Sequence, residues 1–235
     1  MRASLEELLT LSFQRESAAM YTAVPCIITN IPNNLTDLRV DVQPIVNLKY
    51  SDGTSEEHTQ ILGVPVVFPA GRASMVSFPL FVGDTVLCVF SQSSLDNFKS
   101  GAGQIQDASD HRRMDSRDAI AIPGLVPFSK SLNRASARAW PHSTTDMVVA
   151  HNIGTGSEVE IRMQPSGNLI INTNQDVTVN AANAAVNATE NVTVTAGTSI
   201  AMSSPSVTLD TPNASWSGTV NHTGSFTSNG IELHT

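Results

Sequence analysis

The residues of this chain that could support catalysis or metal binding are six histidines and a few pairs of carboxylates. Glu56 lies beside Glu57, and Asp115 lies near Asp118, but both pairs are in polar stretches. Such surroundings favour solvated loops over a tuned acid–base pair. The sequence contains no nucleophile elbow, phosphate-binding glycine loop, HExxH motif or CxxC pair. We therefore expect a protein that is not an enzyme and has no small-molecule substrate.

The stretch from residue 167 to residue 235 has an unusual composition. It contains no Lys or Arg and only four acids, and Asn, Thr, Ser, Ala and Val dominate. Apolar residues occur in pairs two positions apart, which is the period of a strand with one buried face. The pairs recur at spacings of 8, 7, 8, 8, 7, 7, 6, 6 and 5 residues. A repeat this short indicates stacked strands rather than a globular core.

Each repeat offers about two inward side chains, which is too little core for one chain. The simplest solution is three identical chains wound into a triangular β-prism, a rod of roughly 50 Å for ten repeats. A single-chain β-solenoid and a disordered polar linker are the alternatives. The residues expected on the prism axis are Val177, Val179, Val192, Val194, Ile200, Met202, Val207, Leu209, Val220, His222, Ile231 and Leu233.

The charges are distributed unevenly along the chain. Residues 1–138 hold 12 basic and 14 acidic side chains, a net charge of −2, and the remainder holds one basic and seven acidic, a net charge of −6. An acidic rod repels phosphates, so we expect no nucleic acid partner. Cys26 and Cys88 lie in apolar runs and are expected to be buried free thiols. The first residues lack the apolar run of a signal peptide, so synthesis in the cytosol is expected.

The segments before the rod have distinct patterns. Residues 1–22 predict a helix, because Ser4 and Glu7 fit a capping box. Residues 23–128 predict a small all-β barrel of the OB type. Its expected strands are 24–31, 38–50, 54–62, 64–68, 74–78, 85–90 and 119–122, with a hairpin turn at 51–53. Residues 129–145 are read as a collar, and residues 146–235 as the rod.

Three runs of the barrel segment carry a resemblance to a known family. They are LGVPVVFP at 62–69, FPLFVGDTVL at 78–87 and HRRMDSRDAIAIPGL at 111–125. Together with the capped helix and the dyad repeat, they resemble the central baseplate spikes of contractile phage tails, which carry an N-terminal OB domain. The positions that carry the barrel resemblance are Pro65, Pro69, Pro79, Gly83, Asp84, Pro123 and Gly124.

This resemblance implies a homotrimer in the virion, at the tip of the tail baseplate, assembled in the host cytoplasm. The OB domain would dock on the baseplate hub protein, and the β-helix would pierce the host outer membrane for host cell entry. Tips of this family often hold an iron ion through His-x-His motifs from three chains. Here only the first histidine of such a motif, His234, is present, so either the sequence stops short of the full motif or this tip lacks it; iron at the spike tip would rest on His234.

Two other readings remain open at this point. An OB barrel on a β-fibre could be a module that binds glycans or oligonucleotides. A bacterial secretion-system or pyocin-type spike would be built on the same principle as the phage spike.

Overall fold

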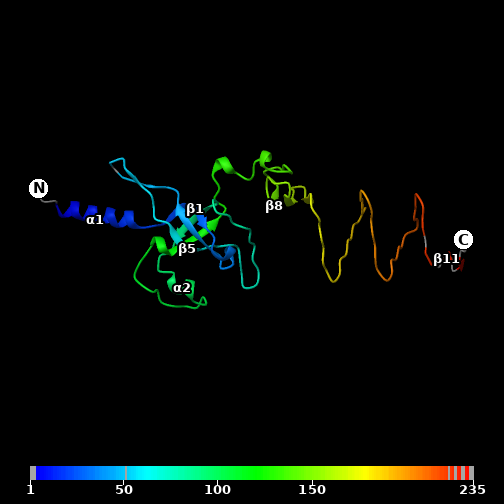
Figure 1. The fold of residues 1–235 in the computed structure, drawn as a ribbon, viewed down its shortest axis with the longest axis horizontal. Helices are drawn as coiled ribbons and strands as arrows, with labels where there is room; N and C mark the ends of the chain where they lie inside the picture. Colours follow the sequence, from blue (N-terminus) through cyan, green and yellow to red (C-terminus); the bar gives the residue numbers. More distant parts are fainter. Residues whose placement is uncertain (1–3, 51, 222, 225–226, 229–230, 233–235) are drawn as a thin grey trace. The chain divides into compact units, whose positions relative to one another are not determined.

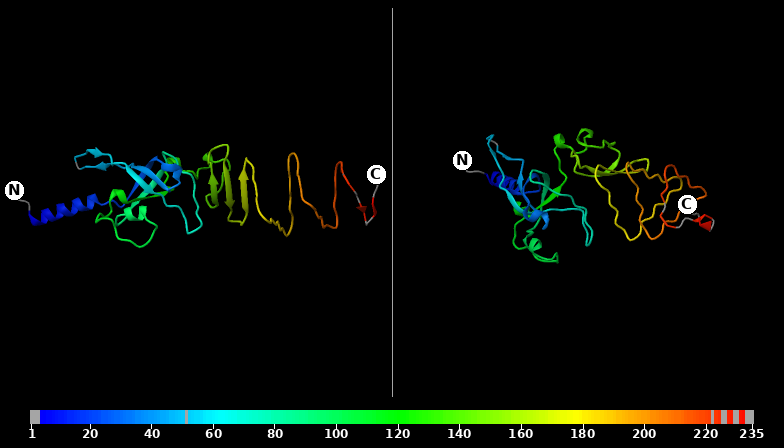
Figure 2. Two further views of the ribbon diagram at one scale, coloured as in Figure 1. Left: turned by 60° about the horizontal axis from the view of Figure 1, so that its bottom comes forward. Right: turned by 45° about the vertical axis from the view of Figure 1, so that its right-hand side comes forward.

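The computed structural model of the chain describes residues 4–50, 52–221, 223–224, 227–228 and 231–232. The chain divides into two compact units, Met1–Val177 and Thr178–Thr235. The first unit begins with helix α1 (Leu5–Ala19), and the predicted capping box is present, because Ser4 and Glu7 exchange hydrogen bonds. The helix projects from the barrel in Figures 1 and 2, and its large apolar side chains are exposed: Leu5, Leu8, Leu9, Leu11 and Phe13.

Five strands form an OB-like barrel, as the sequence predicted. They are β1 (Ala23–Asn30), β2 (Arg39–Pro44), β5 (Ile61–Pro65), β6 (Thr85–Phe90) and β7 (Ala119–Pro123). Their order is β5-β2-β1-β6-β7, and all neighbours in this order are antiparallel. A parallel bridge between Val66 and Ala121 brings the two outer strands together. The N–H of Val67 donates to the carbonyl of Ala121 at 2.9 Å, which is the partly open closure of this barrel type.

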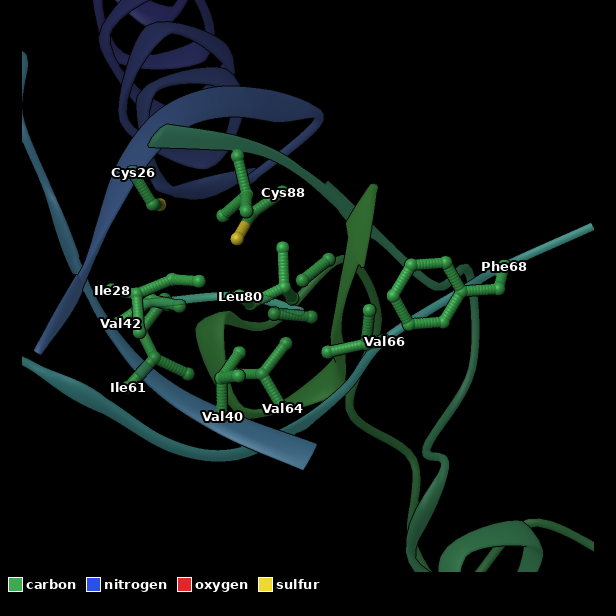
Figure 3. Packing of buried hydrophobic residues seen from close by; sticks show 13 residues of the cluster. Cys26, Ile28, Val40, Val42, Ile61, Val64, Val66, Phe68, Leu80 and Cys88 are labelled. Atoms are coloured by element: carbon green, nitrogen blue, oxygen red, sulfur yellow. The ribbon is translucent and has the colours of Figure 1, made fainter. Parts of the chain in front are cut away.

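The barrel core is small and aliphatic (Figure 3). Alternating residues of the strands point inward, and Val40, Val42, Val64 and Val86 are fully buried. Phe68 and Leu80 from the connecting loop close one side of the core. Cys26 and Cys88 are buried and free, which confirms their predicted state. The thiol of Cys88 has a raised pKa because it hydrogen-bonds to Cys26 and is buried, so it stays protonated.

Several details of the predicted strands are wrong. The expected strand 38–50 divides into β2, which ends at Pro44, and a two-residue strand at Leu48–Lys49, and only residues 55–56 and 61–62 of the expected strand 54–62 lie in strands. Residues 74–78 were expected to form a strand, but only an isolated bridge from Met75 to Ala70 forms there. Residues 54–62 and 64–68 were expected to be separate strands, yet β5 runs through Gly63. Gly63 tolerates this because it adopts a φ of 63°, and its N–H donates to the buried Asp41 carboxylate at 2.8 Å. Asp41 interrupts the register of β2 at the same point.

Short elements connect the barrel strands. They are η1 (Pro32–Leu35), the hairpin β3 (Leu48–Lys49) and β4 (Ser55–Glu56), α2 (Asp96–Ser100), and η2 (Ser116–Asp118). After the barrel come η3 (Phe128–Lys130) and η4 (Ala135–Ala137). A three-stranded antiparallel sheet then follows, formed by β8 (Met147–His151), β9 (Val159–Met163) and β10 (Leu169–Thr173), with β9 in the centre.

The second unit has almost no regular secondary structure of its own in its described residues. Extended runs alternate with bends up to residue 221, and a two-residue pairing joins β11 (Thr227–Ser228) to β12 (Ile231–Glu232). The predicted β-prism is not evident in one chain, so it stays a prediction. Among the described residues, no helix has both the length and the apolar character needed to cross a bilayer.

Candidate functional site

One face of the β8–β10 sheet carries apolar side chains that the described parts of the chain leave uncovered. The register places Met147, Met163 and Leu169 in one row across the three strands. Val149, Ile161 and Ile171 form the next row, and Val159 follows on the central strand. Exposure of these seven side chains runs from 36% for Val159 to 63% for Met147 and Leu169. We call these seven residues the apolar grid.

On the opposite face of the same sheet the central strand β9 is charged and buried, and the flanking Val148 and Ile170 are half-buried. Glu158 and Glu160 are fully buried, and Arg162 is nearly so. The backbone N–H groups of Ala139 and Gly154 donate to one oxygen of Glu158, at 3.0 and 3.1 Å.

The collar supplies the charges that pair with this face. Arg138 Nη1 lies 3.4 Å from Glu160 Oε2, and Arg162 pairs with Glu160 as well. Arg162 Nη2 also donates to the carbonyl of Trp140 at 3.0 Å. The collar is therefore fixed to the sheet through ion pairs and hydrogen bonds.

This arrangement inverts the usual burial of a sheet. A sheet with one solvated face ordinarily buries its apolar side and exposes its polar side. Here the strand alternation is present, but the polar side is covered and the apolar side is open. Burial of one side chain of this size contributes about 1.5–3 kcal/mol, so a contiguous grid left in water is the candidate functional site of this chain.

The apolar pairs that follow the sheet are exposed as well. Among the predicted axial residues with described side chains, exposure ranges from 58% for Val207 to 77% for Val179. They are Val177, Val179, Val192, Val194, Ile200, Met202, Val207, Leu209 and Val220. The chain does not bring these side chains together by itself, so their axial role stays a prediction. Leu233 and His222 lie outside the described residues, as does the side chain of Ile231.

The barrel positions that carried the resemblance fall into two groups. Pro79, Gly83, Asp84, Pro123 and Gly124 line one pocket of about 310 Å³, although they come from separate parts of the chain. The turn before β6 is fixed there, because the N–H of Gly83 and the carbonyl of Asp84 bond the backbone of Ile28. Pro65, at the end of β5, and Pro69 lie away from this pocket.

No metal site can be assigned from the described residues. Within them, no group of three or more His, Cys, Asp or Glu side chains could hold an ion. His234 lies outside those parts of the chain, so its predicted role as an iron ligand stays a prediction.

Sequence reasoning missed a buried ion pair in the loop between β6 and β7. Asp118 was interpreted as part of a solvated face, but its side chain is fully buried. Arg112 donates to both of its oxygens, at 2.7 and 2.9 Å, and the N–H of Leu95 donates at 2.8 Å. Burial raises the pKa of Asp118, but the hydrogen bonds from Arg112 and Leu95 outweigh burial and hold the pKa below its usual range. Only the HRRMDSRD run at 111–118 hinted at such a pair.

Arg112 extends this pairing into a network across the loop. It also bonds Asp110 at 2.6 Å and Asp96, the first residue of α2, at 2.7 Å. The network braces a long loop that contains no apolar core of its own. Arg112 thus holds three carboxylates from separate positions of the loop around one guanidinium.

One family model matches the barrel segment of the chain. Residues 24–124 match the family model described as the Phage protein Gp138 N-terminal domain. No curated protein matches the chain. The matched residues begin within β1 and end just after β7, so they include the five barrel strands and the loop braced by Arg112. Over these residues the chain is similar to the N-terminal domain of the phage protein Gp138.

Proposed function

We propose that this protein is the non-enzymatic central spike of a contractile phage tail, built from three copies of the chain. The OB-like barrel docks on the baseplate hub protein. The following segments of the three copies wind into a triangular β-prism that points at the host and pierces its outer membrane. The family match and the uncovered apolar surfaces support this proposal, and the apolar grid is the observation that carries it.

The grid argues for copies of the same chain as its partners. Its strands continue directly into the exposed pairs, from Ile171 on β10 to Val177 six residues later. A single partner that covers both the apolar grid and the exposed pairs must run alongside the chain over its whole second half. A second copy of this chain has the same repeat, so its strands can lie beside these at the usual distance of about 4.8 Å between paired strands.

The backbone of residues 178–221 gives a second argument. The backbone of these residues runs in long open arms in Figures 1 and 2, yet none of them belongs to a strand. Extended backbone surrounded by uncovered apolar side chains would remain disordered or aggregate if it stayed alone. In an interwoven trimer the neighbouring copies supply the missing hydrogen-bond partners.

Such a trimer fits a mechanical role. A closed prism has free strand edges only at its ends. Unfolding requires three chains to unwind together, which gives the rod kinetic stability rather than a reversible equilibrium. A rod of this kind transmits the force of sheath contraction to the membrane. Under this proposal the protein resides at the tip of the virion's tail baseplate after assembly in the host cytoplasm. Iron bound through His234 at the tip is part of the same proposal.

The mass of the intact protein in solution tests this proposal directly. Light scattering should give three times the mass of the 25.0 kDa chain. An unboiled sample should keep that size on a detergent gel, and a boiled sample should run as a single chain. A monomer in light scattering would reject the proposed spike.

A further inference from the structure

A cleft joins the apolar grid to the barrel. Val76 and Phe78, from the loop between β5 and β6, line one side of it. Val149, Val159 and Ile161 of the grid line the other side. The cleft has a volume of about 460 Å³, which is room for several aliphatic side chains. The grid is therefore one part of a larger apolar surface that begins on the barrel.

The barrel side of the cleft is held in a fixed conformation. The N–H of Val76 donates to the carbonyl of Pro69 at 2.9 Å. Phe78 packs edge-on against the core residue Phe68, with ring centroids 5.1 Å apart. Despite these anchors, Val76 is 66% exposed and Phe78 is 46% exposed. Apolar side chains that are rigid and exposed at the same time are typical of an interface that forms without rearrangement.

We propose that Val76 and Phe78 are the barrel's part of the interface between copies, and that a second copy of this chain fills the cleft. The inference rests on the proposed trimer and extends it from the rod into the barrel. We infer a second copy in the cleft because the cleft is continuous with the grid: Val149 and Ile161 belong to the grid and also line the cleft. A copy that covers these two side chains therefore reaches Val76. Among the residues that line the cleft, Glu160 is the only carboxylate, and it is already paired with Arg162.

Cysteine labelling distinguishes this interface from a merely exposed loop. Val76→Cys and Val82→Cys would each place one thiol at a barrel position of nearly equal exposure in the single chain, 66% and 64%. Val82 does not line the cleft. Val149→Cys, in the grid at 57% exposure, serves as the positive control for burial by a copy. The native Cys26 and Cys88 are buried and give little background.

The variants are prepared as full-length protein, their mass is measured, and their reaction with a maleimide is timed in the native and denatured states. In the native trimer we expect the introduced thiols at positions 76 and 149 to react about tenfold or more slowly than the one at position 82, since access controls thiol reactivity. All three should react alike after denaturation.

Two outcomes would overturn the inference, and they are distinguishable. If the protein is a trimer in which the Val76→Cys thiol reacts as fast as the Val82→Cys thiol, the cleft is empty or awaits another protein, and the inference fails alone. If the unsubstituted protein is a monomer, the proposed function itself fails.

Discussion

At the scale of single residues, the buried pair of Arg112 and Asp118 decides how the longest barrel loop is held. Both residues lie within a run of mixed charges, HRRMDSRD at 111–118. The pair is favourable because Asp118 receives three hydrogen bonds. Removing one member of this buried pair leaves the other charge buried and unpaired. This destabilises the fold far more than the removal of a solvated ion pair does.

The first prediction concerns Asp118→Asn and its pH dependence. A carboxylate whose pKa is lowered by folding stabilises the fold above its unfolded value of about 4, and this contribution is lost as the pH falls through the lowered pKa. At pH 7 the variant should therefore exchange its β6 and β7 amide hydrogens about tenfold or more faster than the parent. The difference should shrink at pH values below about 4.

Asp107→Asn is the matched control, because Asp107 is an exposed carboxylate in the same loop. Its hydrogen exchange should equal that of the parent at every pH. An Asp118→Asn variant whose exchange also equals the parent's at pH 7 would contradict the assigned role of the ion pair.

At the scale of elements, α1 and the collar are held by local contacts rather than by a core. The helix exposes its leucines, and its start is fixed by the reciprocal bonds of Ser4 and Glu7. The collar is fixed to the charged face of the β8–β10 sheet through Arg138 and Ala139. In both cases polar contacts set the position of the element, and apolar surface remains available for other chains.

The second prediction is that Ser4→Ala destabilises α1 without affecting the barrel. Loss of an N-cap costs about 0.5–2 kcal/mol. Because the leucines of α1 are exposed and give it no packing that would compensate, its amide hydrogens should exchange roughly two- to thirty-fold faster. Ser12→Ala, in the middle of the same helix, should leave exchange unchanged or slow it, since Ala favours helix interiors. Equal exchange in parent and Ser4→Ala protein would mean that another chain holds α1.

At the scale of the whole molecule, the second half of the chain has more apolar surface than it can cover. Val192 and Val194 are typical, with 59% and 69% of their surface exposed. Only the alternation of apolar and polar residues distinguishes an inner from an outer face there.

The third prediction uses this alternation. Val194→Asp should abolish the trimer, because it would place three unpaired carboxylates at an apolar axis. Thr193→Asp adds the same charge one position earlier, on the outward face, and should give a normal trimer. Both variants are compared by light scattering and on unboiled detergent gels. Trimer formation by Val194→Asp would show that the inner and outer faces have been assigned the wrong way round.

Several features of this protein are determined by local sequence. The capping box of α1, strand β6 and the hairpin turn around Asp52 are formed where the sequence predicts them. Their signals are contained within a few residues, so backbone preferences and nearest neighbours are enough. The recurrence of apolar pairs after residue 167 can also be seen in the sequence alone, and the assembly that it implies stays a prediction.

Only the tertiary structure decided which face of the β8–β10 sheet is covered. The sequence around β9 alternates Glu158, Glu160 and Arg162 with Val159 and Ile161, and either set could have been buried. The charged set is buried because Arg138, the N–H of Ala139 and the carbonyl of Trp140 reach it from about 20 positions earlier. Asp118 was misjudged for a similar reason, since its exposure depends on how the loop folds back. Burial of a charge depends on partners that folding brings together, and the local pattern does not specify them.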